Sequence, residues 1–211
     1  MSEWMKPADI EKRSFAIITE ELGDRTFPDG IAEVVKRVIH TSADFDYADN
    51  LYFSENVIEK AKAALTAGAT VVTDTNMALS GVSKPALRQL GGSAVCFMAD
   101  EAVAREAKLR GVTRAAVSME HAARLSGPLI FAIGNAPTAL MRLHEMIEAG
   151  EIAPALVIGV PVGFVNVVEA KELFLDGKTP HIIARGRKGG SNVAAAIVNA
   201  LLYQLITREG F

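Results

Sequence analysis

Five short apolar runs that alternate with helix-like segments constrain the fold of this chain most strongly. Apolar runs of this length, bounded by turn residues, are typical of strands that are buried on both faces of a sheet. The helical segments between them favour crossover connections, which join parallel strands. The runs are ATVVTD (69–74), AVCFM (94–98), PLIFAIG (128–134), ALVIGVP (155–161) and HIIARG (181–186). We therefore predict an α/β fold, a three-layer domain with a mostly parallel five-stranded sheet.

Two further helices are predicted ahead of the first strand, where they form an N-terminal helical extension. Residues 7–22 begin with proline, which favours the first turn of a helix. In residues 29–40 apolar side chains recur at i, i+3, i+4, i+7 and i+8, which gives a single apolar stripe. Residues 41–53 are predicted to be a polar loop, and the last helix, at about 191–206, is apolar on most sides. Three later helices are predicted to be capped by Ser54, Ser83 and Asp100.

Composition and charge limit the kinds of protein that this chain can be. With 50% hydrophobic and 22% charged residues it is globular, and without linkers or repeats we expect one domain over residues 1–211. The net charge of −3 argues against a nucleic-acid partner, which needs a broad basic surface. The single cysteine, Cys96, excludes an internal disulfide and is predicted to be a small core residue within its strand. Neither a signal peptide nor a run of about eighteen apolar residues is present, so we predict a cytoplasmic protein without a membrane segment.

Four loops rich in glycine or polar residues follow the predicted strands, at the edge where α/β sheets bind ligands. Glycine lets backbone N–H groups approach a ligand, and helix N-termini favour anions. Every α/β protein needs glycine and proline in its turns, so one such loop alone carries little weight. The loops are TDTNMALSG (73–81), GNAPT (134–138), GVPVGFVN (159–166) and RGRKGGSN (185–192). Their candidate ligand contacts are Thr75, Ser80, Asn135 and Ser191.

Three cations stand close together in the last of these loops: Arg185, Arg187 and Lys188. Because arginine binds carboxylate or phosphate in a bidentate manner, the cluster is a candidate anion site. A solvated charge cluster is the alternative. The chain lacks G-x-x-x-x-G-K-[ST] and G-x-G-x-x-G after a strand, which argues against a nucleotide site, and it lacks the G-x-S-x-G elbow of serine hydrolases.

The segment RVIHTSADFD (37–46) places His40 among several ionisable groups. One histidine with Asp44 and Asp46 matches part of a metal site, but this evidence is weak and we predict no metal. Arg37 and His40 lie on the helix side opposite the apolar stripe. The helix dipole and the nearby carboxylates favour a protonated ring, as a general acid requires. A solvent-facing histidine that ends a helix is the alternative. Structural roles are predicted for His121, His144 and His181.

Together these motifs resemble the precorrin-8 methylmutase (precorrin isomerase) family of cobalamin biosynthesis. The resemblance covers nearly the whole chain and rests on the order and spacing of six segments. They are RSFAII (13–18), RVIHTSADFD, TDTNMALSG, GNAPTALMRL, GVPVGFV and GRKGGSNVAAAIVNALLY (186–203). The segments HTSADFD, MALSG and GRKGGSN are more similar to the branch whose substrate carries cobalt.

The resemblance implies an isomerase that moves a methyl group from C-11 to C-12 of precorrin-8 or cobalt-precorrin-8. The product is hydrogenobyrinate or cobyrinate, and an intramolecular rearrangement requires no cofactor. The family's catalytic histidine falls on His40, which is proposed to protonate the macrocycle. Its substrate contacts fall on Ser14 and Arg37 and, less closely, on Arg114. The family also suggests a homodimer.

A tetrapyrrole (corrinoid) substrate fits the residues themselves, because a broad ring fringed with carboxylates needs both cations and apolar contacts. Arg37 and the three loop cations are candidates for the carboxylates, and Met77 and Phe164 for the ring. One alternative is a carrier that binds the corrinoid without chemistry, for which replacing His40 changes affinity alone. The other is a nucleotide-dependent enzyme on a similar scaffold.

Overall fold

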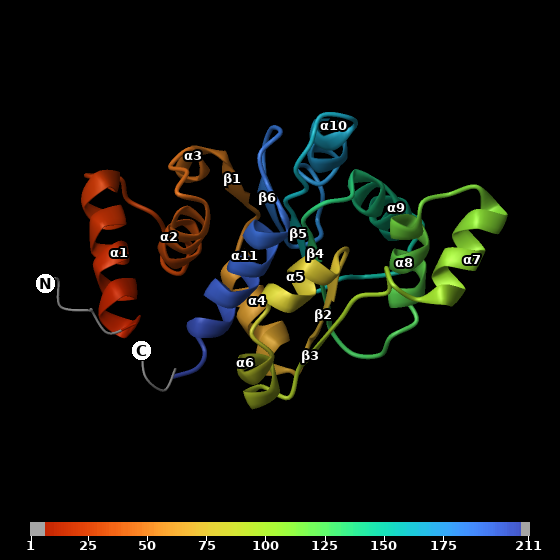
Figure 1. Ribbon diagram of the computed structural model, residues 1–211, viewed down its shortest axis with the longest axis horizontal. Helices are drawn as coiled ribbons and strands as arrows, with labels where there is room; N and C mark the ends of the chain where they lie inside the picture. Colours follow the sequence, from red (N-terminus) through yellow and green to blue (C-terminus); the bar gives the residue numbers. More distant parts are fainter. Residues whose placement is uncertain (1–6, 208–211) are drawn as a thin grey trace, which may run out of the picture.

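A six-stranded sheet with helices on both faces forms the centre of the computed structural model, which describes residues 7–207 (Figure 1). The strands are β1 (Leu51–Phe53), β2 (Thr70–Thr73), β3 (Ser93–Val95), β4 (Leu129–Ile133), β5 (Leu156–Gly159) and β6 (His181–Ala184). Their order is β1-β6-β5-β4-β2-β3, and every neighbouring pair is parallel except β1 and β6. The predicted three-layer α/β fold with a mostly parallel sheet is confirmed.

The sixth strand, β1, corrects the prediction of a polar loop over residues 41–53. Its three residues pair with the edge of β6, which supplies the hydrogen bonds that so short a run needs. A three-residue apolar segment is too short to give a strand pattern in the sequence, so only the fold reveals it. Cys96 also differs from its prediction, since it lies just beyond β3 and is half-buried.

The larger part of the core lies on one face of the sheet. The covering helices are α2 (Ile31–Ser42), α4 (Val57–Thr66), α5 (Asn76–Gly81), α6 (Lys84–Gln89) and α11 (Ser191–Tyr203). Helix α11 is central among them: it packs against the other four, and Ile197 and Leu201 are buried there. Outside this layer α1 (Pro7–Leu22) packs on α2 as the predicted helical extension, and α3 (Tyr47–Asn50) leads into β1 (Figure 1).

A second apolar cluster fills the opposite face. Its helices are α8 (Arg114–Ala122), α9 (Pro137–Glu148) and α10 (Val167–Glu172), with α7 (Glu101–Arg110) packed on α8. Successive strand residues point to opposite faces, so Val71 joins the first cluster and Val72 the second. The strands are therefore buried on both sides, as their continuous apolar runs predict.

Two of the three predicted helix caps are confirmed. Ser83 and Asp100 each accept a backbone N–H from the first turn of the helix that follows. Ser54 is wrong as a cap, because its hydroxyl accepts the N–H of His181 and so ties the end of β1 to the start of β6. Asn56 stands directly before α4 instead, with a positive φ of 55°.

Candidate active site

A buried carboxylate that the sequence analysis missed joins the carboxyl ends of β2 and β4. Asp74 follows β2 directly and is fully buried. Its oxygens accept the backbone N–H groups of Gly134, Asn135 and Ala136 at 2.9, 2.8 and 2.6 Å. Burial raises the pKa of Asp74, while the three N–H donors oppose that shift. The position of an aspartate at the end of a buried strand, in TDT, is the signal that could have found it.

Thr75 and Ser191, two predicted ligand contacts from distant loops, lie side by side at the same edge. Their hydroxyl oxygens are 2.7 Å apart and share a hydrogen bond. The Thr75 oxygen also accepts the N–H of Ala78 and so caps α5. These hydroxyls therefore join α5 to the start of α11. Ser80 is exposed on α5, and the next residue, Gly81, lines a cavity between α11 and the α5–α6 segment.

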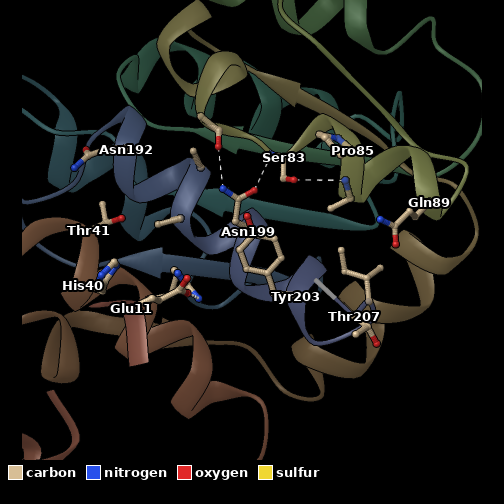
Figure 2. Close-up of a pocket in the computed structure, with 16 residues that line it drawn as sticks. Glu11, His40, Thr41, Ser83, Pro85, Gln89, Asn192, Asn199, Tyr203 and Thr207 are labelled. Carbon is tan, nitrogen blue, oxygen red and sulfur yellow. Dashed lines mark hydrogen bonds and ion pairs between the residues drawn. The ribbon is translucent and has the colours of Figure 1, made fainter. Parts of the chain in front are cut away.

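A cavity of about 940 Å³ lies between α2, α11 and the α5–α6 segment. Its volume is near the upper end of those found for small-molecule sites. Its lining side chains come from three parts of the chain, and those labelled in Figure 2 include Glu11, His40 and Thr41 from the first two helices, Ser83, Pro85 and Gln89 from α6 and its cap, and Asn192, Asn199 and Tyr203 from α11. Of the predicted site residues, only the catalytic candidate His40 and the substrate contact Arg37 line it.

His40 stands in the last turn of α2, with its side chain exposed at the cavity. Its ring stacks on Phe15 of α1, with centroids 5.3 Å apart and planes at 24°. His40 also lines a smaller cavity of about 280 Å³ together with Ser14. The Ser14 hydroxyl donates to the carbonyl of Ile10 within α1. His40 and Ser14 thus line the same small cavity.

Arg37 lies one helical turn before His40 and is held from several sides. Its Nη2 is 2.6 Å from the Glu11 carboxylate, and the side chains of this pair are only 16% and 15% exposed. The guanidinium also lies 4.6 Å from the Phe15 ring centroid and 5.3 Å from that of Tyr203. These contacts fix the cation at the cavity wall.

Asn199 forms a polar part of the cavity wall that the sequence did not indicate. Its Oδ1 accepts the N–H of Ser83 at 2.8 Å and its Nδ2 donates to the carbonyl of Gly81 at 2.8 Å. The side chain therefore fastens the α5–α6 segment to α11, which sets the distance between two cavity walls (Figure 2). Its role depends on the crossing of these helices and has no local sequence signal.

The three cations of the last loop are exposed, but they differ in what they contact. The Lys188 ammonium lies 2.7 Å from Asp44 and 2.6 Å from Asp46. This ammonium lowers the pKa of Asp44, and the two carboxylates raise that of Lys188. The Arg187 guanidinium lies 5.5 Å from the ring centroid of Phe164. The two aspartates considered as metal ligands beside His40 thus bind a lysine.

Two predicted contacts lie away from the cavity. Arg114 begins α8 on the other face of the sheet from α2, and its side chain is exposed. The neighbouring Thr113 donates to the Thr138 hydroxyl, so the start of α8 lies beside the first turn of α9. Asn135 is exposed, with its backbone N–H bound by Asp74.

The other histidines make contacts outside the cavity. His121 Nε2 is 3.0 Å from the Glu106 carboxylate, and His144 packs edge-on against Phe174. Buried His181 stacks on Tyr52 at 5.6 Å. Over residues 7–207, no group of three or more histidine, cysteine, aspartate or glutamate side chains is arranged to hold a metal ion. No helix in that range is long and apolar enough to cross a membrane.

The chain matches the precorrin-8X methylmutase family model over residues 9–204. It is 45% identical to the cobalt-precorrin-8 methylmutase of Salmonella typhimurium, over 95% of this chain and 96% of that protein. It is 41% identical to the precorrin-8X methylmutase of Pseudomonas aeruginosa, over 91% and 93%.

A solved structure of the precorrin-8X methylmutase from Thermus thermophilus has the same fold. It superposes with a TM-score of 0.84 at 38% identity, over 92% of this chain and 95% of that one. The likeness in sequence and in fold thus extends over almost the entire chain, including the helices that form the cavity. The chain belongs to the precorrin-8X methylmutase family, isomerases that act in cobalamin biosynthesis.

Proposed function

We propose that this enzyme moves the methyl group at C-11 of cobalt-precorrin-8 to C-12 and so forms cobyrinate. The observation that carries the proposal is that His40 and Arg37 line one cavity of about 940 Å³. A proton donor and a fixed cation at one wall suit a large ring that carries carboxylates. Relatives named for the cobalt substrate, at 45%, 43% and 42% identity, favour that form over metal-free precorrin-8, which would give hydrogenobyrinate.

In this proposal His40 acts as the general acid. Its protonated ring gives a proton to the macrocycle, which makes the ring carbons electron-poor. The bond from the methyl group to C-11 then breaks as the bond to C-12 forms. Because an isomerisation has no net proton change, the macrocycle returns one proton afterwards, and His40 is restored. No cofactor or external methyl donor is required.

The charged and apolar side chains around His40 have separate roles in the proposal. Arg37 binds a carboxylate of the substrate inside the cavity, and Ser14 adds a polar contact beyond His40. Arg185 and Arg187 are exposed and meet carboxylates at the rim. Exposed Met77 and Phe164 meet the apolar ring. Lys188 is a lesser contact, because two of its three N–H groups are already engaged by aspartates.

Four predicted contacts outside the cavity have weaker structural support: Thr75, Ser80, Asn135 and Ser191. Thr75, Ser80 and Ser191 lie near the cavity-lining residues Gly81 and Asn192, and Asn135 lies on the neighbouring loop that Asp74 holds. A substrate that extends along the carboxyl edge of the sheet could reach all four. Arg114 lies farther away, and we propose that it reaches substrate from a second copy in a homodimer. The cytoplasm stays the predicted compartment.

The first experiment is anaerobic incubation of the purified protein with cobalt-precorrin-8, followed by its visible spectrum, beside His40→Ala. We expect catalytic conversion by the wild type, and binding with loss of most turnover by the variant. A carrier protein gives a different result, a spectral shift only at stoichiometric protein and equal in both. Wild-type turnover by His40→Ala would contradict the general-acid role.

A further inference from the structure

Lys171, on α10, is a buried cation that the proposed chemistry does not use. Its residue is 1% exposed, and its Nζ donates to the backbone carbonyls of Gly186 and Lys188, both at 2.8 Å. Burial lowers the pKa of Lys171 to about 8, and within residues 7–207 no carboxylate offsets that shift. Burying an ammonium without a counter-ion costs free energy. Here the two hydrogen bonds of the ammonium offset part of that cost and hold the backbone of one loop.

The two carbonyls belong to the loop of residues 185–190, and other contacts hold that loop against β5. The N–H of Gly190 donates to the carbonyl of Val160 at 2.9 Å, and the N–H of Gly163 to that of Arg187 at 3.2 Å. A Cβ at Gly189 would lie 2.1 Å from the Val160 oxygen, so the loop passes this strand end as closely as glycine permits. Lys171 fixes the loop from the side of α10.

The opposite side of the loop reaches the end of α2. The Lys188 ammonium binds Asp44 and Asp46, which directly follow that helix. The N–H of Asp44 donates to the Ser42 hydroxyl at 3.3 Å, and the N–H of Ala43 to the carbonyl of Ile39 at 2.7 Å. These bonds fix the last turn of α2, which carries His40.

We propose that Lys171 is a positioning residue: it fixes the loop of residues 185–190 so that Lys188 holds Asp44 and Asp46, and thereby sets the position of His40. Lys171 binds the backbone of the loop, and Lys188 on the same loop binds the two aspartates. The functional consequence rests on the proposed role of His40, whereas the structural linkage can be measured without substrate.

Hydrogen exchange of the substrate-free protein tests the linkage by itself. Lys171→Met keeps the length of the side chain, removes its N–H donors and suits the buried position. We expect the amides of Gly190 and Ala43 to exchange at least about tenfold faster in this variant, a larger rise than at Phe131 in the core. Equal rises at all three amides, or none at Ala43, would overturn the proposal. If Lys171→Met fails to fold, Lys188→Met is the second variant, because its side chain is exposed. It must then raise exchange at Ala43 at least about tenfold, and by more than at Phe131.

Turnover of cobalt-precorrin-8 tests the consequence for His40. We expect Lys171→Met to lower kcat about tenfold and KM by less than about twofold, because the interaction lost orients the acid. The double variant Lys171→Met/Lys188→Met should have no lower kcat than Lys188→Met alone, because both lysines act through the contact of Lys188 with Asp44 and Asp46. Additive losses, or lower thermal stability with an unchanged kcat, would refute the proposal. Lys178→Met, at an exposed lysine outside the site, is the matched control. If the wild type does not turn over, the proposed function fails, and the exchange result still decides the linkage.

Discussion

The His40 ring stacks on Phe15, with centroids 5.3 Å apart and planes at 24°. The two side chains come from different helices, so the stack fixes the orientation of the proposed acid relative to the cavity. It also makes the helical extension part of the site, because α1 carries Phe15 and the Glu11 partner of Arg37.

The first prediction concerns this stack. Phe15→Leu keeps an apolar side chain but removes the aromatic face, which contributes about 0.5–1.5 kcal/mol in such pairs. We expect kcat to fall by roughly two- to tenfold, measured by steady-state turnover. Ile10→Ala, at an exposed position of the same helix, should keep the wild-type rate. An unchanged kcat in Phe15→Leu would show that the stack does not orient His40.

Arg37 should contribute to binding and to stability at once. Arg37→Ala removes the guanidinium that lies 2.6 Å from the mostly buried Glu11 carboxylate, which should lower the free energy of unfolding by roughly 1–3 kcal/mol. Arg37→Lys keeps the charge but not the planar fork, so it should recover much of the stability while KM stays raised. Urea unfolding and steady-state kinetics separate the two effects. Equal KM values for Arg37→Lys and wild type would contradict a bidentate contact.

Asp74 should matter for stability more than any other carboxylate at the sheet edge. In Asp74→Asn one acceptor oxygen becomes an NH₂ group that faces backbone N–H donors, and the loss of paired buried groups should cost about 2–4 kcal/mol. Urea unfolding measures this. Asp100→Asn is the control, because asparagine caps a helix as well as aspartate does. Equal stability of both variants would contradict the prediction.

Stability should decrease on mild acidification because of His181. Burial lowers the pKa of its imidazole below 6.5, so beneath that pH the unfolded chain binds a proton that the folded chain does not. The free energy of unfolding therefore falls as pH drops from 6.5 towards the lowered pKa. His181→Phe can keep the stack on Tyr52 and should flatten this slope, measured by urea unfolding at several pH values. An identical slope in the variant would assign the effect to other groups.

The sequence predicts the fold well where burial leaves a repeated pattern. The five parallel strands are buried on both faces and are continuous apolar runs, and α2 shows its apolar stripe through Val34 and Val38. By contrast, β1 forms only through its antiparallel pairing with β6. A pattern of three residues cannot encode a partner that lies about 130 positions away.

The candidate site could be predicted only in part, for a similar reason. His40 and Arg37 lie one turn apart on one helix, so their common face follows from helix geometry. Asn199 and Tyr203 line the same cavity because α11 crosses beside α2, a contact between distant segments. The loop cation Lys188 is predicted from its neighbours in the sequence, but its two aspartate partners come from a segment more than a hundred residues earlier.

The pairing of α2 with α11 has a consequence for synthesis of the protein. One wall of the cavity leaves the ribosome early and the facing wall emerges only with the C-terminal part of this sequence. The same late helix fills the middle of the larger core. A nascent or prematurely terminated chain therefore lacks both a complete interior and the proposed substrate cavity.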